Sequence, residues 1–289
     1  MKNNYTLLLT GATGMIGGSL VRRILEHEAP CQMILPVRDI GKAEKLYEDL
    51  QDSDYQRLQF VEMQMGTKAI LELARKKQVK SMVYLSSMEV YGRMKDTDGL
   101  ISEDQLGNID LKEPRSCYPL GKRMAEHYCY IYCYEHKIPV KIARLAQTFG
   151  KGVRLADSRV YMQFAHAVHE SRDIVLKTRG MSMGNYCALD DAVEGILTIL
   201  HKGKNGEAYN VVNESNTMRI GEMAKLVVEK VAKGRIGVRV EGEDAVKNGY
   251  APDTDLRLSG RKLRELGWEP KKGLEDMYRE VLEAIKEVI

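Results

Sequence analysis

A glycine-rich turn near the start of the chain constrains its fold more than any other feature. Gly11, Gly14 and Gly17 lie between an apolar run at 7–9 and an amphipathic segment at 19–25, an order typical of strand, tight loop and helix. Glycines at this spacing let backbone N–H groups approach a pyrophosphate, and the helix N-terminus adds free donors. Rather than a glycine turn without a ligand, we predict a dinucleotide-binding βα unit that holds its cofactor through Gly11, Thr13, Gly14, Met15, Ile16 and Gly17.

Composition narrows the class of protein. The 289 residues are 44% hydrophobic and 29% charged with a formal net charge of +3, which is typical of a globular chain and gives no reason to propose nucleic acid or membrane as a partner. No apolar run approaches the roughly 20 residues that span a bilayer, and no leader precedes the first strand, so we expect a cytoplasmic protein. The odd number of scattered cysteines favours free thiols. Cys129, Cys133 and His136 have ligand-like spacing but lack a second cluster, and we predict no metal site.

Strand-like and helix-like segments alternate through the first half of the chain. This alternation predicts an α/β fold, with a doubly wound, mostly parallel Rossmann-type sheet in a dinucleotide-binding domain over residues 1–150. Residues 151–289 alternate less regularly and predict a smaller mixed α/β substrate lobe, with some segments returning to the main sheet. We expect the polar segment 93–117 to be a surface excursion. Apolar runs predict strands at 31–38, 58–62, 81–85 and 140–145, and periodicity predicts a helix at 66–78. Pro119 is typical of the first turn of a helix, and we expect a long helix there that runs to about Lys137.

The end of the second predicted strand bears on the choice of cofactor. Arg38 comes first there and Asp39 follows. An acidic residue at this position accepts a hydrogen bond from an adenosine ribose and favours NAD, whereas a basic residue can pair with a 2′-phosphate and favours NADP. Because Arg38 is the better candidate for the strand end, we favour NADP and keep NAD as the alternative.

A tyrosine and a lysine four residues apart open the long predicted helix. Tyr118 and Lys122 therefore share one helix face, and a lysine beside a phenol stabilises the phenolate, so that the tyrosine can act as an acid or base. The pair Tyr91 and Lys95 has the same spacing but lies in a predicted loop, where the spacing means little. Ser87 ends the preceding strand at the sheet edge that faces ligands, and its hydroxyl can bind a substrate oxygen.

Five segments of the chain resemble the extended short-chain dehydrogenase/reductases, also called the NAD-dependent epimerase/dehydratase family. The resemblance implies that Tyr118, Lys122 and Ser87 are catalytic, that Tyr118 and Lys122 also contact the cofactor, and that the substrates are nucleotide sugars. It further implies hydride transfer through a keto-sugar intermediate, and a homodimer that pairs the helices beginning near 66 and at 118. The segments that carry it are 10–17, 84–92, 118–122, 143–150 and 185–192.

Glu89 bears on the type of reaction that the resemblance implies. Dehydratases and decarboxylases of the family place a Glu there, where a carboxylate can remove a proton next to a keto group. Dehydratases often have an acid just before it, and this chain has Met88 instead. Standard 4,6-dehydration therefore lacks its usual proton donor, while epimerisation, decarboxylation and keto reduction stay open. The alternative for Glu89 is a solvated loop carboxylate.

Two further positions depart from the family pattern. Gln147 stands where an Asn is common, and Gly184 stands where an Arg often contacts the nucleotide diphosphate. Other arginines could supply the phosphate contact instead, namely Arg154, Arg159, Arg179 and Arg257.

The largest departure from the family lies between Val61 and Gly66. The family places a helix and a central strand there, and about 40 to 50 residues are missing by the size of such units. Either the deletion is real or the sequence joins segments across an omitted region. We therefore hold two hypotheses: an NAD(P)-dependent nucleotide-sugar epimerase/dehydratase-type enzyme, or a non-catalytic relative that still binds a nucleotide.

Overall fold

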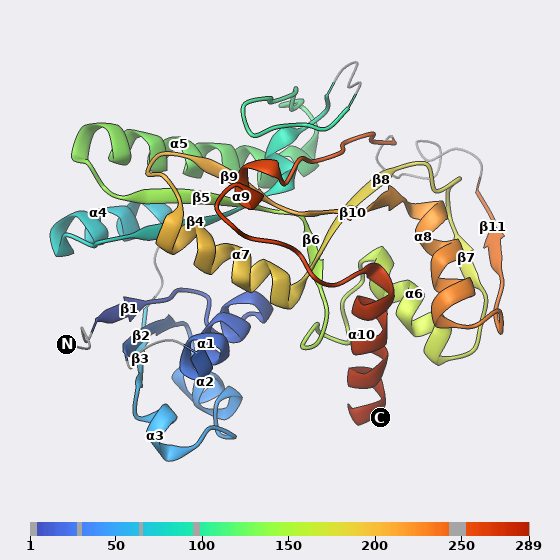
Figure 1. Cartoon of the computed structure of the whole chain (residues 1–289), viewed down its shortest axis with the longest axis horizontal. Helices are drawn as coiled ribbons and strands as arrows, with labels where there is room; N and C mark the ends of the chain where they lie inside the picture. Colours follow the sequence, from blue (N-terminus) through green and yellow to red (C-terminus); the bar gives the residue numbers. More distant parts are fainter. Residues whose placement is uncertain (1–4, 28–30, 64–65, 95–98, 243–252, 289) are drawn as a thin grey trace. The chain divides into compact units, whose positions relative to one another are not determined.

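The computed structural model describes residues 5–27, 31–63, 66–94, 99–242 and 253–288 (Figure 1). The chain divides into two compact units, Met1–Ile70 and Leu71–Ile289. Within the described ranges, none of the helices has both the length and the apolarity that a membrane crossing requires. All five cysteines are free thiols, as the sequence predicts.

Over the described residues of 5–62, the first unit forms a parallel three-stranded sheet with three helices. Its strands run in the order β1–β2–β3, and β2 pairs in register with both neighbours. The apolar face of α1 is buried through Leu20, Val21, Ile24 and Leu25, which recur at helical spacing, and β2 contributes the buried Leu35. The elements are β1 (Thr6–Leu8), α1 (Met15–His27), β2 (Gln32–Val37), α2 (Ile40–Leu46), α3 (Asp52–Tyr55) and β3 (Leu58–Glu62).

A second parallel sheet, in the order β4–β5–β9, lies at the centre of the second unit. Every residue of β5 is buried, as expected for a central strand covered on both faces. Helices α5 and α7 lie on opposite sides of this sheet (Figure 1). The register aligns Ser87, Leu145 and Val211 at the carboxyl edge. The elements are α4 (Thr67–Lys77), β4 (Met82–Ser87), α5 (Cys117–His136), β5 (Val140–Leu145), α7 (Leu189–Lys202) and β9 (Ala208–Val211).

The remaining elements of the second unit form two smaller sheets with flanking helices. Strand β8 pairs parallel to β6 and antiparallel to β10, and β7 pairs parallel to β11. Phe149 packs between the rings of Tyr161 and Tyr278, which ties β6 to α6 and α10. The elements are β6 (Gln147–Phe149), α6 (Val160–His169), β7 (Ile174–Leu176), β8 (Met183–Ala188), β10 (Asn213–Arg219), α8 (Ile220–Leu226), β11 (Val238–Val240), α9 (Arg261–Arg264) and α10 (Leu274–Val288).

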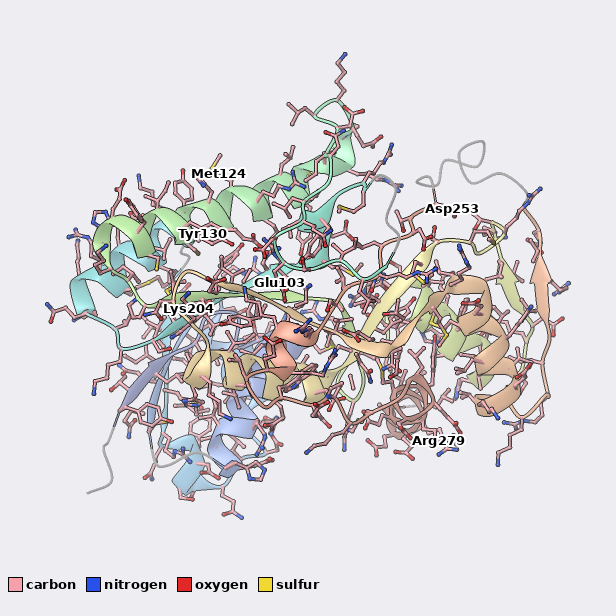
Figure 2. The ribbon with its side chains drawn as sticks, turned by 45° about the horizontal axis from the view of Figure 1, so that its top comes forward. Glu103, Met124, Tyr130, Lys204, Asp253 and Arg279 are labelled. Carbon is pink, nitrogen blue, oxygen red and sulfur yellow. The ribbon has the colours of Figure 1, made fainter. Side chains whose placement is uncertain are left out.

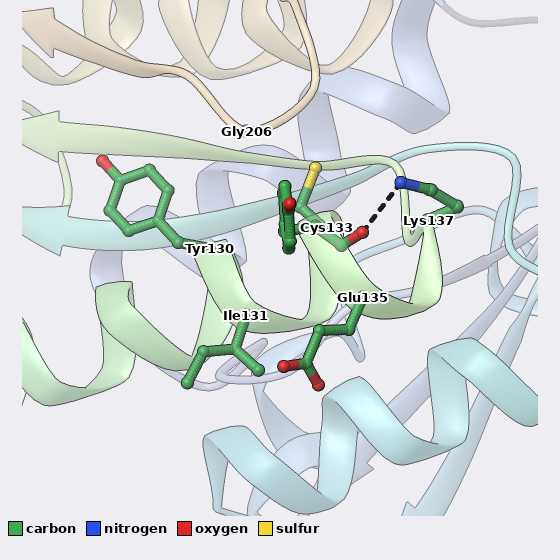
Figure 3. A pocket seen from close by; sticks show the side chains of 7 residues that line it. Tyr130, Ile131, Cys133, Glu135, Lys137 and Gly206 are labelled. Atoms are coloured by element: carbon green, nitrogen blue, oxygen red, sulfur yellow. Dashed lines mark hydrogen bonds between the residues drawn. The ribbon is translucent and has the colours of Figure 1, made fainter.

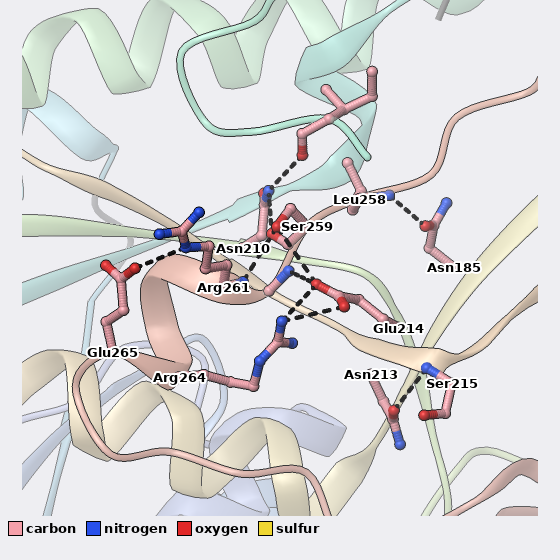
Figure 4. Close-up of polar contacts among 12 residues, drawn as sticks. Asn185, Asn210, Asn213, Glu214, Ser215, Leu258, Ser259, Arg261, Arg264 and Glu265 are labelled. Carbon is pink, nitrogen blue, oxygen red and sulfur yellow. Dashed lines mark hydrogen bonds and ion pairs between the residues drawn. The ribbon is translucent and has the colours of Figure 1, made fainter. Parts of the chain in front are cut away.

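Polar side chains hold segment 253–260 against these sheets. The Asn185 carbonyl oxygen on β8 accepts a hydrogen bond from the Leu258 N–H at 2.9 Å, and the Glu214 carboxylate on β10 accepts one from the Gly260 N–H at 2.6 Å (Figure 4). The segment is therefore fixed by side chains from two strands.

The prediction of a surface excursion at 93–117 is wrong in part. Ile101 is buried, its N–H donates to the Arg257 carbonyl at 2.7 Å, and its carbonyl accepts from the Ser259 N–H at 2.9 Å. Glu103 is also buried. Segment 93–117 is held at Ile101 because segment 253–260, far along the chain, pairs with it through backbone hydrogen bonds like those between strands.

The fold class predicted from the sequence is confirmed: the fold is α/β, with parallel Rossmann-type sheets and additional mixed elements. In the described residues β1 and β4 belong to separate sheets. The missing helix–strand unit stays a prediction, and residues 64–65 of its junction lie outside the described residues. The domain boundary at 150 also stays a prediction, although β9 from the later half of the chain pairs with β5.

Candidate active site

The glycine turn of the first unit has the geometry that a phosphate cradle requires. Gly11 has φ of +74°, a left-handed conformation that favours glycine, and its carbonyl accepts from the Gly14 N–H at 2.9 Å. A Cβ at Gly11 would meet no atom within 4 Å, so this part of the loop is open to a ligand. Helix α1 begins directly afterwards, at Met15. The turn therefore fits a dinucleotide pyrophosphate, which would bind to the exposed backbone N–H groups and the positive end of the helix.

Close packing explains the third glycine of the turn. A Cβ at Gly17 would lie 2.1 Å from the Gly11 carbonyl oxygen and 2.7 Å from the Gly11 carbonyl carbon. The loop can fold back against α1 only because position 17 has no side chain.

Tyr47 supports the same turn, and sequence reasoning missed it. Its buried hydroxyl donates to the Ala12 carbonyl at 2.7 Å, and burial raises the pKa of Tyr47 to about 12. The Arg22 guanidinium of α1 lies 5.6 Å from the Tyr47 ring centroid and pairs with Asp49 at 2.8 Å. No motif or periodicity marks Tyr47, because its partner Ala12 lies 35 residues earlier.

Arg38 and Asp39 have different surroundings at the end of β2. Arg38 is exposed immediately after the strand. Asp39 is the N-cap of α2, and its carboxylate accepts from the Lys42 N–H at 2.9 Å. One of its oxygens is therefore engaged by the helix, whereas the Arg38 side chain extends into solvent.

In the second unit, the end of β4 carries Ser87 and turns into a short 3-10 helix, η1 (Met88–Tyr91). Ser87 caps this helix, since its hydroxyl oxygen accepts from the Glu89 N–H at 3.2 Å. The Glu89 side chain reaches solvent, but surrounding protein atoms partly desolvate it and raise the pKa of its carboxyl above the usual value. A carboxyl with a raised pKa at a strand end suits general acid–base work.

Tyr118 and Lys122 lie in the first turns of α5. The Lys122 ammonium donates to the Leu85 carbonyl of β4 at 2.8 Å and lies 5.9 Å from the Tyr118 ring centroid and 5.1 Å from the Tyr84 ring centroid. Desolvation lowers the pKa of Lys122. Tyr118 itself is 52% exposed, so its ring is accessible to a ligand. The structure thus brings Tyr118 and Lys122 to the strand that ends in Ser87, while their catalytic roles stay a prediction.

The helix begins at Cys117, one residue before Tyr118, and Pro119 lies in its first turn, as predicted. The 3-10 turn η2 (Pro114–Ser116) leads directly into α5 at Cys117. Pro119 is then the third residue of the helix, where its missing N–H is not needed. The competing pair at Tyr91 is not comparable, because Tyr91 is buried and Lys95 lies outside the described residues.

The positions that depart from the family pattern are explained in part. At Gly184 of β8, a Cβ would lie 2.4 Å from the Tyr186 hydroxyl oxygen, so the Tyr186 ring excludes an arginine there. Gln147 starts β6 and pairs with Tyr186. Among the arginines that could contact phosphate, Arg159 pairs with Asp157 and Arg257 pairs with Asp255, while Arg154 and Arg179 are exposed.

A separate, open surface depression of about 570 Å³ lies at the other end of α5 (Figure 3). Tyr130 and Cys133 line it beside Gly206, and the Lys137 ammonium donates to the Tyr134 carbonyl. It begins 12 residues after Tyr118, or about 18 Å along a helix that rises 1.5 Å per residue, and is distinct from the Tyr118 site. In the part of the chain that the structure describes, no group of three or more His, Cys, Asp or Glu residues could hold a metal ion.

Comparison with known proteins identifies the family. Residues 47–212, more than half of the chain, match the NAD dependent epimerase/dehydratase family. The chain belongs to this family. This epimerase/dehydratase family member is 26% identical to dTDP-D-glucose 4,6-dehydratase of Homo sapiens over 223 residues, which cover 77% of this chain and 61% of the human protein. The chain thus spans about three-fifths of the length of that relative and of its Bos taurus counterpart.

Other relatives cover more of the chain. UDP-glucuronic acid decarboxylase 6 of Arabidopsis thaliana is 26% identical over 313 residues, which cover 95% of this family member and 87% of the plant protein. That aligned stretch is longer than the 289 residues of this chain, so it contains positions that this chain lacks.

Solved structures share the fold at low sequence identity. dTDP-glucose 4,6-dehydratase of Bacillus anthracis, in complex with NAD, superposes with a TM-score of 0.78 at 19% identity and covers 98% of this chain and 97% of its own. UDP-glucuronic acid 4-epimerase of Bacillus cereus, in complex with UDP-glucuronic acid and NAD, has a TM-score of 0.78 at 18% identity over 98% and 100% of the two chains.

Proposed function

We propose that this protein is an NAD(P)-dependent nucleotide-sugar enzyme of the epimerase/dehydratase type that works through a keto-sugar intermediate. The observation that carries the proposal is the position of the Lys122 ammonium between Tyr118 and the end of β4. Family membership supports the enzyme class, and relatives that act on dTDP-glucose and UDP-glucuronic acid support the substrate class.

Each residue takes the role that the family resemblance implies for it. Tyr118 takes the proton of a sugar hydroxyl as the carbon is oxidised and returns it when the ketone is reduced. Lys122 stabilises the phenolate of Tyr118 by its charge and can bind a ribose hydroxyl. Ser87 donates a hydrogen bond to the reacting oxygen as its charge changes. The glycine turn would hold the pyrophosphate of a nicotinamide cofactor, and that cofactor would supply the acceptor and donor of the hydride.

Glu89 is the second base of the proposed mechanism. Its raised pKa suits it to take a proton from the carbon next to the ketone and to give it back. Met88 is buried and its side chain has no acidic proton, so the usual proton donor of a 4,6-dehydration is missing. Decarboxylation of a UDP-glucuronic acid-like substrate is the second candidate reaction, because the plant decarboxylase aligns over 95% of this chain.

Tyr118→Phe and Lys122→Met test the assignment. Each nucleotide sugar, namely UDP-glucuronic acid, UDP-glucose and dTDP-glucose, is incubated with the wild-type chain and NAD or NADP, and products are followed by NMR. Removing the phenol should lower kcat by about 10² to 10⁴-fold, the usual contribution of a general acid–base group. Equal turnover by Tyr118→Phe and the parent would refute the mechanism. Cofactor binding without turnover of any sugar would favour the non-catalytic relative.

The proposed cofactor is NADP, with NAD as the alternative. Arg38 is exposed at the strand end, whereas Asp39 already caps α2. The dehydratase of Bacillus anthracis and the epimerase of Bacillus cereus are complexes with NAD, so this preference needs its own test. Fluorescence titration should give tighter binding of NADPH than NADH, and Arg38→Ala should weaken NADPH by about tenfold. Equal affinities in the parent would contradict the preference.

A homodimer is the proposed assembly and the cytoplasm the proposed location. Helix α5 exposes Met124 (55%) and Tyr134 (80%) on its outer face, and Met124 points away from the sheet (Figure 2). Helix α4 packs beside α5 through Leu71 and Cys129. Light scattering should give twice the mass of one chain, and Met124→Glu should reduce it. A single-chain mass for the parent would exclude the dimer. The free thiols support a reducing compartment.

A further inference from the structure

Arg123 joins α5 to two loops through backbone carbonyls. Its Nε donates to the Val90 carbonyl at 2.7 Å, and its Nη2 donates to the carbonyls of Gly107 at 2.6 Å and Tyr91 at 3.3 Å. The side chain is half-buried, and it directly follows Lys122 in the helix. One guanidinium therefore satisfies three carbonyls on segments that are 16 to 33 residues away.

Two of the three carbonyls that Arg123 binds, those of Val90 and Tyr91, belong to the turn that carries Glu89. Val90 and Tyr91 end η1, and the Glu89 N–H at its start is bonded to the Ser87 hydroxyl. The Glu89 carbonyl also accepts from the Gly92 N–H at 3.2 Å. Glu89 is thus held on one side by the end of β4 and on the other by Arg123.

A second set of hydrogen bonds, made by the Tyr91 side chain, attaches the same turn to the protein core. The Tyr91 hydroxyl donates to the Asn210 side chain at 2.7 Å and accepts from Arg144 at 3.1 Å. Arg144 forms a buried double hydrogen bond with Glu126 of α5, at 2.8 and 3.0 Å. Because this network does not include Arg123, η1 stays attached to the core when the Arg123 side chain is removed.

From this geometry, and resting on the function proposed above, we infer that Arg123 is a positioning residue that sets Glu89 in place relative to Tyr118 and Lys122. The planar fork of arginine can reach carbonyls in several directions at once, whereas a lysine ammonium on a flexible stem cannot reproduce that fixed geometry. A displacement of about 1 Å at a reacting group can cost about a hundredfold in rate.

Three variants of the full chain test the inference. Arg123→Met removes the three hydrogen bonds, and Arg123→Lys keeps the charge without the fork. Arg279→Met is the matched control, because Arg279 lies on α10 (Figure 2) and pairs only with Glu275 among the described interactions. For each, kcat, KM and the pH–rate profile are measured on the sugar that the parent converts, and hydrogen exchange is followed over 88–92 with α7 as the reference.

Arg123→Met should lower kcat by about ten- to a hundredfold with little change in the KM for cofactor, because the cofactor turn is untouched. The acid limb of its pH–rate profile should move to lower pH, since Glu89 becomes more hydrated. Exchange over 88–92 should accelerate by at least about tenfold while α7 is unchanged. Arg123→Lys should fall between the parent and Arg123→Met, and Arg279→Met should match the parent.

Unchanged exchange over 88–92, or accelerated exchange with an unchanged kcat, would overturn the inference. If Arg123→Met does not fold, Arg123→Lys decides by the same measurements. If the parent turns over no nucleotide sugar, the proposed function fails, and Arg123 is still judged by exchange over 88–92 and by the Glu89 carboxyl pKa measured with NMR. In that case, the positioning role of Arg123 is overturned if Arg123→Met changes neither the exchange over 88–92 nor the pKa of the Glu89 carboxyl.

Discussion

Replacing Gly17 by alanine tests the account of the glycine turn, with Gly18→Ala as a control one residue away. A Cβ at position 17 would lie 2.1 Å from the Gly11 carbonyl oxygen and 3.1 Å from the Ala12 Cα, so backbone atoms must move by about 1 Å to restore contacts above 3.0 Å. A Cβ at position 18 would meet the Ala12 carbonyl oxygen at 3.4 Å, an ordinary contact. The two variants make the same chemical change in the same helix.

The expected free energies have opposite signs. Alanine in a helix is favoured over glycine by about 1 kcal/mol, and Gly18→Ala should be stabilised by up to that amount. Gly17→Ala gains the same helix propensity, but the overpacking of its Cβ against backbone atoms costs about 1 to 3 kcal/mol or more, because backbone atoms cannot move aside as a flexible side chain can. Its net change should be destabilising, and its displaced loop should bind cofactor at least about tenfold more weakly.

Urea denaturation and fluorescence titration with NADH and NADPH measure the two effects. Gly18→Ala should keep the parent's cofactor affinity, whereas Gly17→Ala should lose affinity and unfold at lower urea. Equal behaviour of the two variants, or normal cofactor binding by Gly17→Ala, would refute the close approach of α1 to Gly11 on which the cradle depends.

Three further predictions concern stability and pH. Tyr47→Phe leaves the buried Ala12 carbonyl without its 2.7 Å donor and should cost about 1 to 3 kcal/mol of unfolding free energy, measured by urea denaturation; no loss would mean that the bond does not form. Glu126→Gln leaves the buried Arg144 charge uncompensated and should cost about 3 to 5 kcal/mol, seen as a lower thermal midpoint; a change below 1 kcal/mol would contradict a desolvated pair. Because burial raises the pKa of Glu89, kcat should rise with pH through a value above the ordinary glutamate pKa of about 4.3, as the carboxylate base forms. Glu89→Gln should remove this rising limb of the kcat profile. A limb that persists in the variant belongs to another group.

Sequence reasoning was most successful where structure depends on neighbouring residues. β3 (Leu58–Glu62) and β5 (Val140–Leu145) have the predicted bounds, because a short run rich in apolar and β-branched residues is a local signal for a strand. The helix that carries Tyr118 and Lys122 was likewise predicted, from Pro119 in its first turn. The 3-10 turn that precedes it was not predicted, because it depends on capping by Glu113 and on Pro114, which no periodicity reveals.

Long-range contacts were beyond the reach of the sequence. The hydrogen bond from Tyr91 to Asn210 joins residues 119 apart, and the anchoring of Ile101 depends on a segment more than 150 positions later. The raised pKa of Glu89 arises from desolvation, which exists only once the folded chain surrounds that carboxyl. Such effects depend on which strands pair, and pairing is a property of the whole chain.

The sequence by itself determined the glycine turn, the spacing of Tyr118 and Lys122, and the family resemblance, because backbone freedom and helical spacing are local properties. Only the tertiary structure decided that Tyr47 supports the turn and that Tyr186 excludes a side chain at Gly184. It alone placed Arg123 across the loop that carries Glu89. The physical reason is that hydrogen bonds and steric exclusion act between atoms in contact, and folding alone brings distant residues into contact.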